Sequence, residues 1–192
     1  MNRKNKELII PIVSGTGIGY GHKDAFHHAL MEAGIATFNH VCYSSVIPPY
    51  STLLLDRKLE IDPDKLRELH GHRMFSVMAC ATTTIPGTEA VAGIGWVNNP
   101  ETGGYFVEYH GHSEEEVEDL IRVSLGELVK MHKDIYGNEP FGDDPVKFKL
   151  EKILFEPKSE RDKIGCALVA ALFSYQDARG GEEYTNAWQF KD

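Results

Sequence analysis

Apolar residues recur along this chain with two different periods, and each period predicts one kind of element. Runs that alternate with polar residues, or that are continuously apolar over a short length, are typical of strands, since strand side chains alternate between two faces. The segment 166–175 is nearly all apolar, so we expect it at the centre of a sheet. The predicted strands are 7–14, 75–81, 90–97, 105–109, 147–156 and 166–175, together with one at the start of the segment 39–49.

Two longer segments carry apolar residues at helical spacing. The first spans 23–33 and is followed by Gly34, a residue suited to helix carboxyl ends. The second spans 113–136, where Ser113 and Glu116 predict a capping box at the positive end of the helix. The mostly polar segment 56–68 contains Pro63 at a predicted helix start.

Glycine-rich segments separate several of these elements. The segment 15–21 begins with the spacing Gly15-x-Gly17, but its later glycines break the dinucleotide-binding fingerprint. We therefore expect a loop there, in which the backbone bends tightly or approaches a neighbouring chain. The segment 100–104 predicts the turn of a hairpin.

The elements follow in the order β-α-β-β-β-β-α-β-β, without an internal repeat or a linker. Strands dominate, and we expect them to pair mostly through hairpins with the helices packed outside the sheets, which is an α+β fold. A chain of 192 residues suits one domain, 1–192, with a complete hydrophobic core.

Composition narrows the classes of partner and the compartment. The formal charge of −9 argues against nucleic acid and anionic membranes as partners, because both require a basic face. No segment has the length of a membrane span, and the apolar run near the amino terminus is too short for a signal peptide. Cys42, Cys80 and Cys166 are odd in number and widely spaced, which predicts buried, reduced thiols in a cytoplasmic protein.

The segment 39–49 has the most distinctive chemistry. It opens with residues that favour a strand and stops at two prolines that cannot continue a ladder. Between them lie Ser44 and Ser45, so that the Ser45 hydroxyl is within reach of the Ser44 carbonyl if the backbone holds it there. Taken alone, two adjacent serines are more often simple turn formers.

The wider sequence resembles the pyruvoyl-dependent arginine decarboxylases. The resemblance begins with the self-cleavage region, in Ala33-Gly34-Ile35, Phe38-Asn39 and the segment 44–49. It continues through the small-residue strand at 86–96, the glutamate-bearing strand at 107–109 and the last core strand at 163–171. It covers residues 7 to about 175 in order.

This resemblance implies a fold, a processing event and an assembly. The fold is a four-layer αββα sandwich, self-cleaved between Ser44 and Ser45 into a small β chain and a larger α chain. Ser45 becomes the pyruvoyl group, Ser44 ends the small chain, and Asn39 assists the cut. The cleaved protomers form a homotrimer or a higher multiple, with active sites between subunits.

The resemblance also implies decarboxylation of a small-molecule amino-acid substrate, with arginine to agmatine plus CO2 as the leading case. The pyruvoyl cofactor forms a Schiff base with the substrate amine and accepts electrons as CO2 leaves. Glu108 reprotonates the resulting carbanion. We expect the apolar neighbours Tyr105, Val107 and Tyr109 to surround it.

One position departs from the family. An acidic residue that follows an Ala-aromatic pair in the first helix binds the substrate guanidinium, and the matching residue here is His27. Histidine lacks the two-oxygen acceptor that a guanidinium prefers. Asp24 is close in sequence, but we expect it to point elsewhere around the helix. His27 is therefore the candidate substrate-binding residue, and a different amino-acid substrate stays open.

Two alternatives come from other classes of protein. His70-Gly71-His72 and His110-Gly111-His112 each place two imidazoles on one face of an extended segment, as a transition-metal site requires. We give this lower weight, because scattered surface histidines are common, and commit to no metal. A non-catalytic relative that serves an assembly is the other alternative, and failure to self-cleave favours it.

Overall fold

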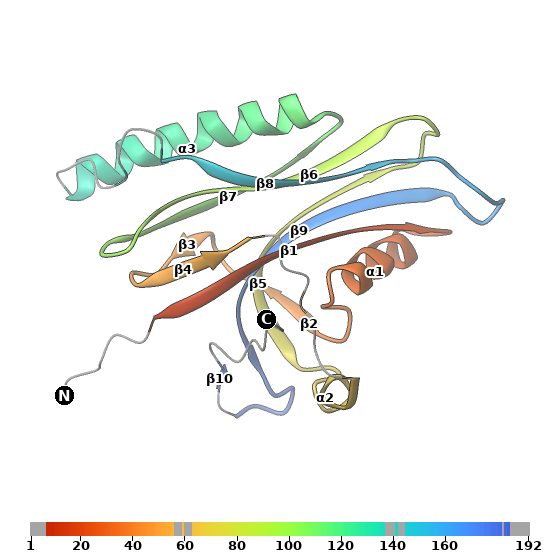
Figure 1. Cartoon of the computed structure of the whole chain (residues 1–192), viewed down its shortest axis with the longest axis horizontal. Helices are drawn as coiled ribbons and strands as arrows, with labels where there is room; N and C mark the ends of the chain where they lie inside the picture. The colour runs from red at the N-terminus through yellow and green to blue at the C-terminus, as the bar shows by residue number, and fades with distance from the viewer. Residues whose placement is uncertain are drawn as a thin grey trace.

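The computed structural model describes residues 7–55, 59, 63–136, 141, 145–181 and 183–184. Its elements stack in four layers, as Figure 1 shows. Helix α1 (His22–Glu32) lies against a six-stranded sheet, a four-stranded sheet packs on the other face of that sheet, and α3 (Glu114–Tyr136) covers the outside. The predicted αββα sandwich is confirmed.

The six-stranded sheet has the order β2-β5-β9-β1-β4, with β10 paired to β9. The predicted central position of the apolar strand is confirmed, because β9 lies between β5 and β1. The pairings of β2 with β5 and of β1 with β4 are parallel. The bounds are Leu8–Gly19 for β1, Asn39–Cys42 for β2, Ser51–Leu54 for β4, Arg73–Thr83 for β5, Ile164–Gln176 for β9 and Glu183–Tyr184 for β10.

The four-stranded sheet has the order β3-β7-β6-β8, and all its pairings are antiparallel. The turn predicted at 100–104 is confirmed, since it joins β6 to β7. The expectation of pairing mostly through hairpins is wrong, because among the described strands only β6 with β7 and β9 with β10 pair with the strand that follows them in the sequence. The bounds are Val46–Ile47 for β3, Glu89–Asn99 for β6, Gly103–Gly111 for β7 and Lys147–Leu154 for β8.

The two sheets bury a shared core of small and aromatic side chains. Phe106 from the second sheet meets Phe173 from the first and also packs against Trp96, and several alanines belong to the same cluster. Each large apolar side chain that is fully buried contributes about 1.5–3 kcal/mol relative to exposure. The sandwich therefore holds together chiefly through this central layer.

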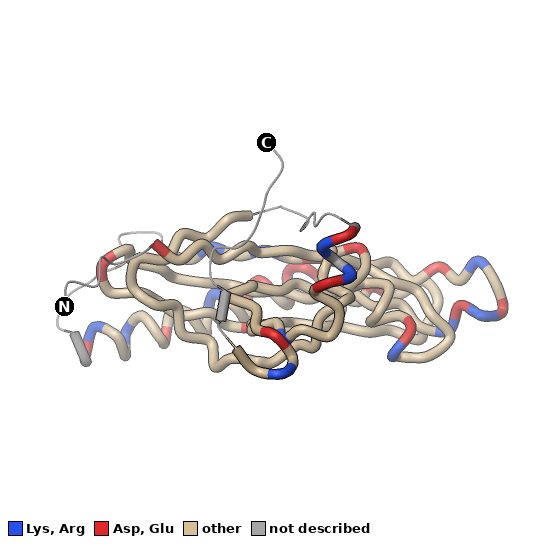
Figure 2. The backbone as a smooth tube through the Cα atoms, turned by 90° about the horizontal axis from the view of Figure 1, so that it is seen from below, with Lys and Arg blue, Asp and Glu red and all other residues tan. Residues whose placement is uncertain are grey.

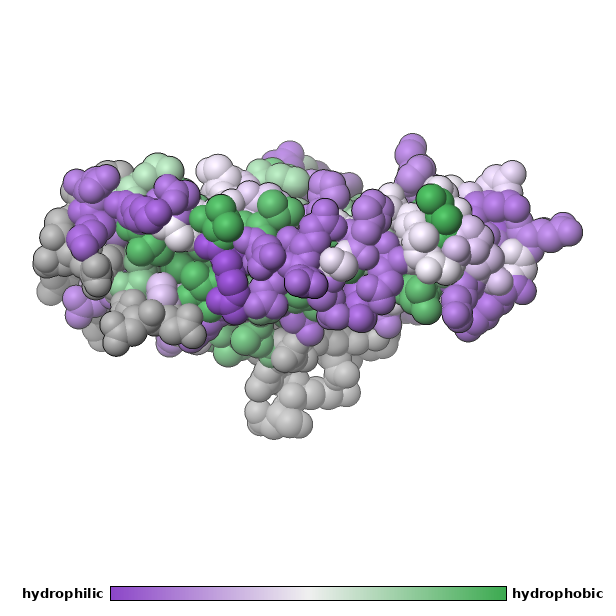
Figure 3. Space-filling model, turned by 90° about the horizontal axis from the view of Figure 1, so that it is seen from above, coloured by the Kyte–Doolittle hydropathy of each residue, from purple (hydrophilic) through white to green (hydrophobic). Residues whose placement is uncertain are grey.

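Helix α3 covers the second sheet with one apolar stripe. Val117, Ile121 and Leu125 are fully buried against β6 and β7. The predicted capping box forms only in part. The Ser113 hydroxyl accepts the N–H of Glu116, as predicted, but the Glu116 carboxylate accepts the N–H of His112 instead of that of Ser113. Figure 3 shows that the outer surface on this side is largely polar, with separate apolar spots.

The glycine-rich segment predicted as a loop is part of a strand. β1 runs to Gly19, and its alternate glycines all face α1. A Cβ at Gly15, Gly17 or Gly19 would lie 2.2–2.4 Å from main-chain atoms of the helix. The prediction of a loop was wrong because these glycines provide close packing of the chain's own helix, which their spacing alone does not reveal.

Many of the charged residues lie at turns and on helices (Figure 2), and among the strands β8 carries the most, namely Lys147, Lys149, Glu151 and Lys152. Helix α2 (Pro63–Glu68) begins at the predicted proline. Cys166 is buried and Cys80 is partly buried, but Cys42 is exposed, so the expectation that all three thiols are buried is wrong. Within the described part of the chain, no helix is both long enough and apolar enough to cross a bilayer.

The contact between β1 and α1 generates a stability prediction. Gly17→Ala should lower the free energy of unfolding by about 1–3 kcal/mol, since the added methyl meets helix backbone rather than a flexible side chain. Gly126→Ala in α3 is the control, because its Cβ would have nothing within 4 Å. It should raise stability by about 1 kcal/mol. Urea unfolding measures both, and a Gly17→Ala protein as stable as wild type would contradict this packing.

Candidate functional site

The serine pair lies where the chain crosses from the first sheet to the second. β2 ends at Cys42, in parallel pairing with β5, and β3 begins at Val46, in antiparallel pairing with β7. Residues 43–45 connect these two strands. The sequence predicted a strand before the serines, and the structure adds that the strands on either side belong to different layers.

The residue before the serine pair is anchored to the first sheet. The Tyr43 N–H donates to the Ser76 carbonyl over 3.0 Å. Its ring stacks on Phe75, with centroids 5.1 Å apart, and meets the ring of Phe173 edge-on at 5.4 Å. Aromatic pairs in these geometries contribute about 0.5–1.5 kcal/mol beyond their area burial. Tyr43 therefore fixes one side of the crossing.

The residue after Ser44 is anchored to the second sheet. The Ser45 carbonyl accepts the Phe106 N–H over 2.8 Å, and Ile47, two residues on, is buried between the sheets. Gly103 packs closely against this strand, because a Cβ at Gly103 would lie 2.2 Å from the Ile47 carbonyl oxygen. The peptide that joins Ser44 to Ser45 is thus held at both ends.

The structure brings Ser45 and Glu108 together. The Ser45 Oγ donates to Glu108 Oε1 over 2.5 Å, and both residues are half-buried. A hydrogen bond from a hydroxyl to a carboxylate is short and strong, because the acceptor is charged. Both residues were expected to be catalytic, but no sequence pattern could show that they are in direct contact.

The expected surroundings of Glu108 are wrong. Tyr105, Val107 and Tyr109 pack toward α3, whereas Phe106 faces the core between the sheets. Because strand side chains alternate, Glu108 shares the face of Phe106. The carboxylate therefore lies on the inner side of β7, the same side as the Ser45 hydroxyl.

The Ser44 carbonyl, which belongs to the bond expected to be cut, also has a donor. It accepts the Val46 N–H over 2.6 Å, in a bond that spans only one intervening residue. The Ser44 side chain itself is exposed. No residue-type signal could have predicted this contact, because both partners are main-chain atoms.

The Asn39 side chain is engaged elsewhere. Its Nδ2 donates to the Gly71 carbonyl over 2.8 Å, and its main-chain N–H donates to the His72 carbonyl. These bonds tie the start of β2 to the turn before β5. In the described structure, the Asn39 amide contacts this turn and is not brought to the serine pair.

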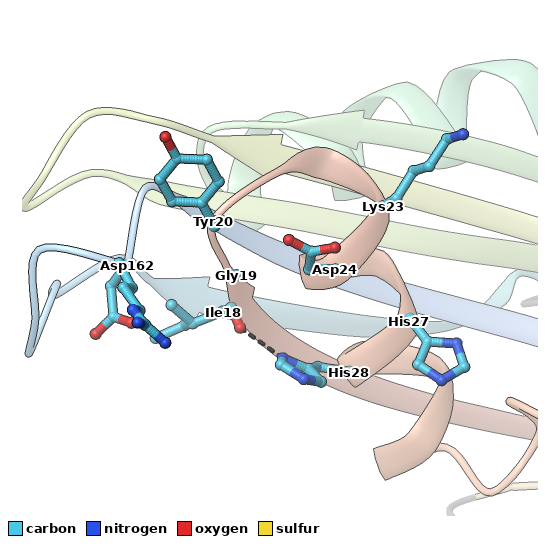
Figure 4. Close-up of a pocket in the computed structure, with 9 residues that line it drawn as sticks. Ile18, Gly19, Tyr20, Lys23, Asp24, His27, His28 and Asp162 are labelled. Atoms are coloured by element: carbon cyan, nitrogen blue, oxygen red, sulfur yellow. Dashed lines mark hydrogen bonds between the residues drawn. The ribbon is translucent and has the colours of Figure 1, made fainter.

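His27 lines a separate pocket of about 650 Å³. Figure 4 shows this pocket beside the first half of α1, with Ile18 and Gly19 from the end of β1 and Asp162 from the loop before β9. The His28 Nδ1–H donates to the Ile18 carbonyl over 2.6 Å. The pocket lies on the outer face of the first sheet, and its lining contains none of the expected catalytic residues.

Asp24 lines the same pocket as His27, which corrects the expectation that it points elsewhere. Its Oδ2 accepts the Gly21 N–H at the start of α1 over 3.1 Å. Asp162 accepts the main-chain N–H of Lys158, and this hydrogen bond, reinforced by contacts with Ser159, lowers the pKa of the Asp162 carboxyl. The pocket also contains the cations Lys23 and Arg161, so both signs of charge are present.

The two histidine pairs do not converge. His72 lies 3.6 Å from an Asp177 carboxylate oxygen, and His112 contacts the Glu89 carbonyl. Among the described residues, no three histidine, cysteine, aspartate or glutamate side chains are grouped as a metal ion requires.

Comparison with known proteins identifies a family for this chain. The family model described as pyruvoyl-dependent arginine decarboxylase matches residues 9–178. A pyruvoyl-dependent arginine decarboxylase of Methanococcoides burtonii is 36% identical over 157 residues, covering 76% of this chain and 81% of that protein. Pyruvoyl-dependent arginine decarboxylase 2 of Archaeoglobus fulgidus is 31% identical over 121 residues, covering 62% and 73%.

Pyruvoyl-dependent arginine decarboxylase 1 of Archaeoglobus fulgidus is 36% identical over 91 residues, which are 46% of this chain and 54% of that relative. The chain therefore spans about half the length of this relative and most of the length of the other two. The family match runs from β1 to just past β9 and includes both Ser45 and Glu108. The chain belongs to the pyruvoyl-dependent arginine decarboxylase family.

Proposed function

We propose that this chain is one decarboxylase domain, 1–192, that cuts itself between Ser44 and Ser45 and converts arginine to agmatine and CO2. The observation that carries the proposal is the 2.5 Å hydrogen bond from Ser45 Oγ to Glu108 Oε1 at the crossing between the sheets. The family match supports the reaction class and the pyruvoyl group. Arginine is supported by the names of the relatives.

The self-cleavage proceeds through the residues at the crossing. The Ser45 hydroxyl adds to the Ser44 carbonyl carbon, the carbon–nitrogen bond breaks, and the hydroxyl proton passes to the freed nitrogen, which leaves an ester. Elimination then takes a proton from the α-carbon of residue 45 and releases the Ser44 carboxylate. Water hydrolyses the remaining dehydroalanine to a pyruvoyl group with loss of ammonia.

The residues present fit such a group. Residue 45 is half-buried beside an apolar core, and a carboxyl group lies against it. A pyruvoyl group at this position supplies an electron sink for the pair left on the substrate when CO2 departs. Glu108 holds its carboxyl on the inner side of β7, where Oε1 can deliver a proton to the substrate carbon.

The location of the pocket supports an assembly. His27 lies outside the first sheet and Glu108 lies between the sheets, so a small substrate that contacts both residues must lie between two protomers. We propose a homotrimer of cleaved protomers, or a higher multiple, in the cytoplasm. The net charge of −9 supports a small-molecule substrate rather than nucleic acid.

The first prediction concerns processing. Ser45→Ala should remain full length, because it lacks the attacking hydroxyl, whereas wild type should give fragments 1–44 and 45–192. Ser14→Ala is the matched control, since the Ser14 hydroxyl also donates to a glutamate, Glu151, over 2.6 Å. It should cut like wild type. Intact mass spectrometry measures all three, and cleavage of Ser45→Ala at this bond would rule out the proposed nucleophile.

The second prediction separates processing from decarboxylation. Glu108→Gln should still cut itself, because the amide oxygen can accept the Ser45 hydroxyl. Its rate of CO2 release should fall by about 10²–10⁴-fold, the usual contribution of a general acid. Glu151→Gln is the control and should keep its turnover. A fully processed Glu108→Gln enzyme with wild-type turnover would exclude the role.

The third prediction concerns specificity. His27→Asp should raise activity on arginine relative to lysine, ornithine, histidine, aspartate and glutamate, since a carboxylate can pair with both N–H groups of a guanidinium edge. His70→Asp, at an exposed turn, should leave the profile unchanged. Light scattering should give at least three times the 21.5 kDa protomer mass. An unaltered profile in His27→Asp, or a monomer, would contradict a shared site at His27.

A further inference from the structure

We propose that the main-chain N–H of Val46 stabilises the oxyanion that forms on the Ser44 carbonyl during self-cleavage. The inference rests on the proposed function, since it concerns the bond between Ser44 and Ser45. The hydrogen bond from which it is argued was not used in that proposal. The Ser44 carbonyl oxygen accepts the Val46 N–H over 2.6 Å, which is short for a bond between main-chain groups.

The chemistry of the step requires such a donor. When the Ser45 hydroxyl adds to the Ser44 carbonyl carbon, the carbonyl oxygen takes up negative charge. A donor that already points at this oxygen stabilises the charge without reorganising during the reaction. The Val46 N–H is in this position before the reaction begins.

The sheet topology explains why the N–H of Val46 is available. β3 is the edge strand of the second sheet and pairs only with β7. In an antiparallel ladder, hydrogen-bonded pairs alternate with pairs that exchange no hydrogen bond. The Phe106 N–H donates to the Ser45 carbonyl, so the pair Val46 and Tyr105 is of the second kind, and the main-chain groups of Val46 point away from β7. The Val46 N–H therefore takes no part in the ladder with β7 and turns back to Ser44.

The turn also positions the nucleophile. A bond from residue 46 to residue 44 closes a γ-turn with Ser45 at its centre. Tyr50 is the only described non-glycine residue with positive φ, so the turn at Ser45 is the common inverse form. The Ser45 hydroxyl is held by Glu108 at 2.5 Å. One tight turn thus contains the nucleophile, the carbonyl and the oxyanion donor.

Within the described part of the chain, no second hydrogen-bond donor reaches the Ser44 carbonyl. The Asn39 amide, which the family resemblance associates with the cut, donates to the Gly71 carbonyl. The anchors at Tyr43 and at the Ser45 carbonyl hold the turn from both sides, so the Val46 contact is part of the folded state before cleavage. The geometry assigns catalysis here to a main-chain group of the edge strand.

The first test removes the donor with a single substitution. Val46→Pro lacks the N–H and should slow the appearance of fragments 1–44 and 45–192 by about 10²–10³-fold, the cost of losing one oxyanion donor. Val46→Ala keeps the N–H and should cut at the wild-type rate, because the Val46 side chain is exposed. Time-resolved intact mass spectrometry gives the rates, and thermal unfolding checks that each variant is folded.

A second variant covers the case in which proline disturbs the strand. Replacing Val46 with the α-hydroxy acid analogue of valine exchanges the N–H for an ester oxygen and keeps the side chain. It should slow cleavage by a similar factor, while the same exchange at Ile47 should not. If the folded ester variant cuts as fast as wild type, the oxyanion role is wrong. If wild type itself does not cut, the proposed function fails instead.

Discussion

The passage of the chain from one sheet to the other through residues 43–45 is the constraint on which the candidate site depends. Tyr43 is fixed to the first sheet by a main-chain hydrogen bond and two ring contacts, and the Ser45 carbonyl is fixed to the second sheet by Phe106. A peptide held at both ends in this way keeps few conformations. The energy for this restraint comes from the packing of the two sheets, so the site is a property of the whole sandwich.

The same crossing places Ser45 and Glu108 where the proposed function needs them, for both processing and turnover. Ser45 and Glu108 lie on the side of β7 that faces the apolar core between the sheets, and both are half-buried. In the proposed function, the carboxylate orients a hydroxyl before cleavage, and after cleavage the same carboxyl would lie beside the reactive end of the larger fragment. One contact would thus serve two successive reactions.

Much of the fold could be predicted from the sequence, because periodicity is a local property. The strand at 166–175 and the helix at 113–136 were found where expected. The glycines of β1 were assigned to a loop, since only tertiary contact with α1 shows why a strand would carry them. Pairing order was also missed, because β9 joins strands that lie far apart along the chain.

The candidate site, too, could be predicted only in part from the sequence. Ser45 and Glu108 were identified by resemblance, and the structure shows their direct contact. The bond of Asn39 to Gly71 depends on how distant segments are placed, which no local pattern encodes. Asp24 and His27 are three residues apart on α1, so helical spacing does put them on one face, and the expectation for Asp24 misapplied that rule. The Val46 donor is a main-chain N–H, so no residue type in the sequence could have predicted it.

The central claim is that residue 45 becomes a pyruvoyl group, and the mass of the larger fragment tests it most directly. The wild-type fragment 45–192 should be measured before and after borohydride reduction. A mass that fits a keto group in place of the amino end, rising by two hydrogen atoms on reduction, is the predicted result. An uncut chain, or a fragment that keeps an ordinary amino terminus and does not respond to borohydride, would contradict the account.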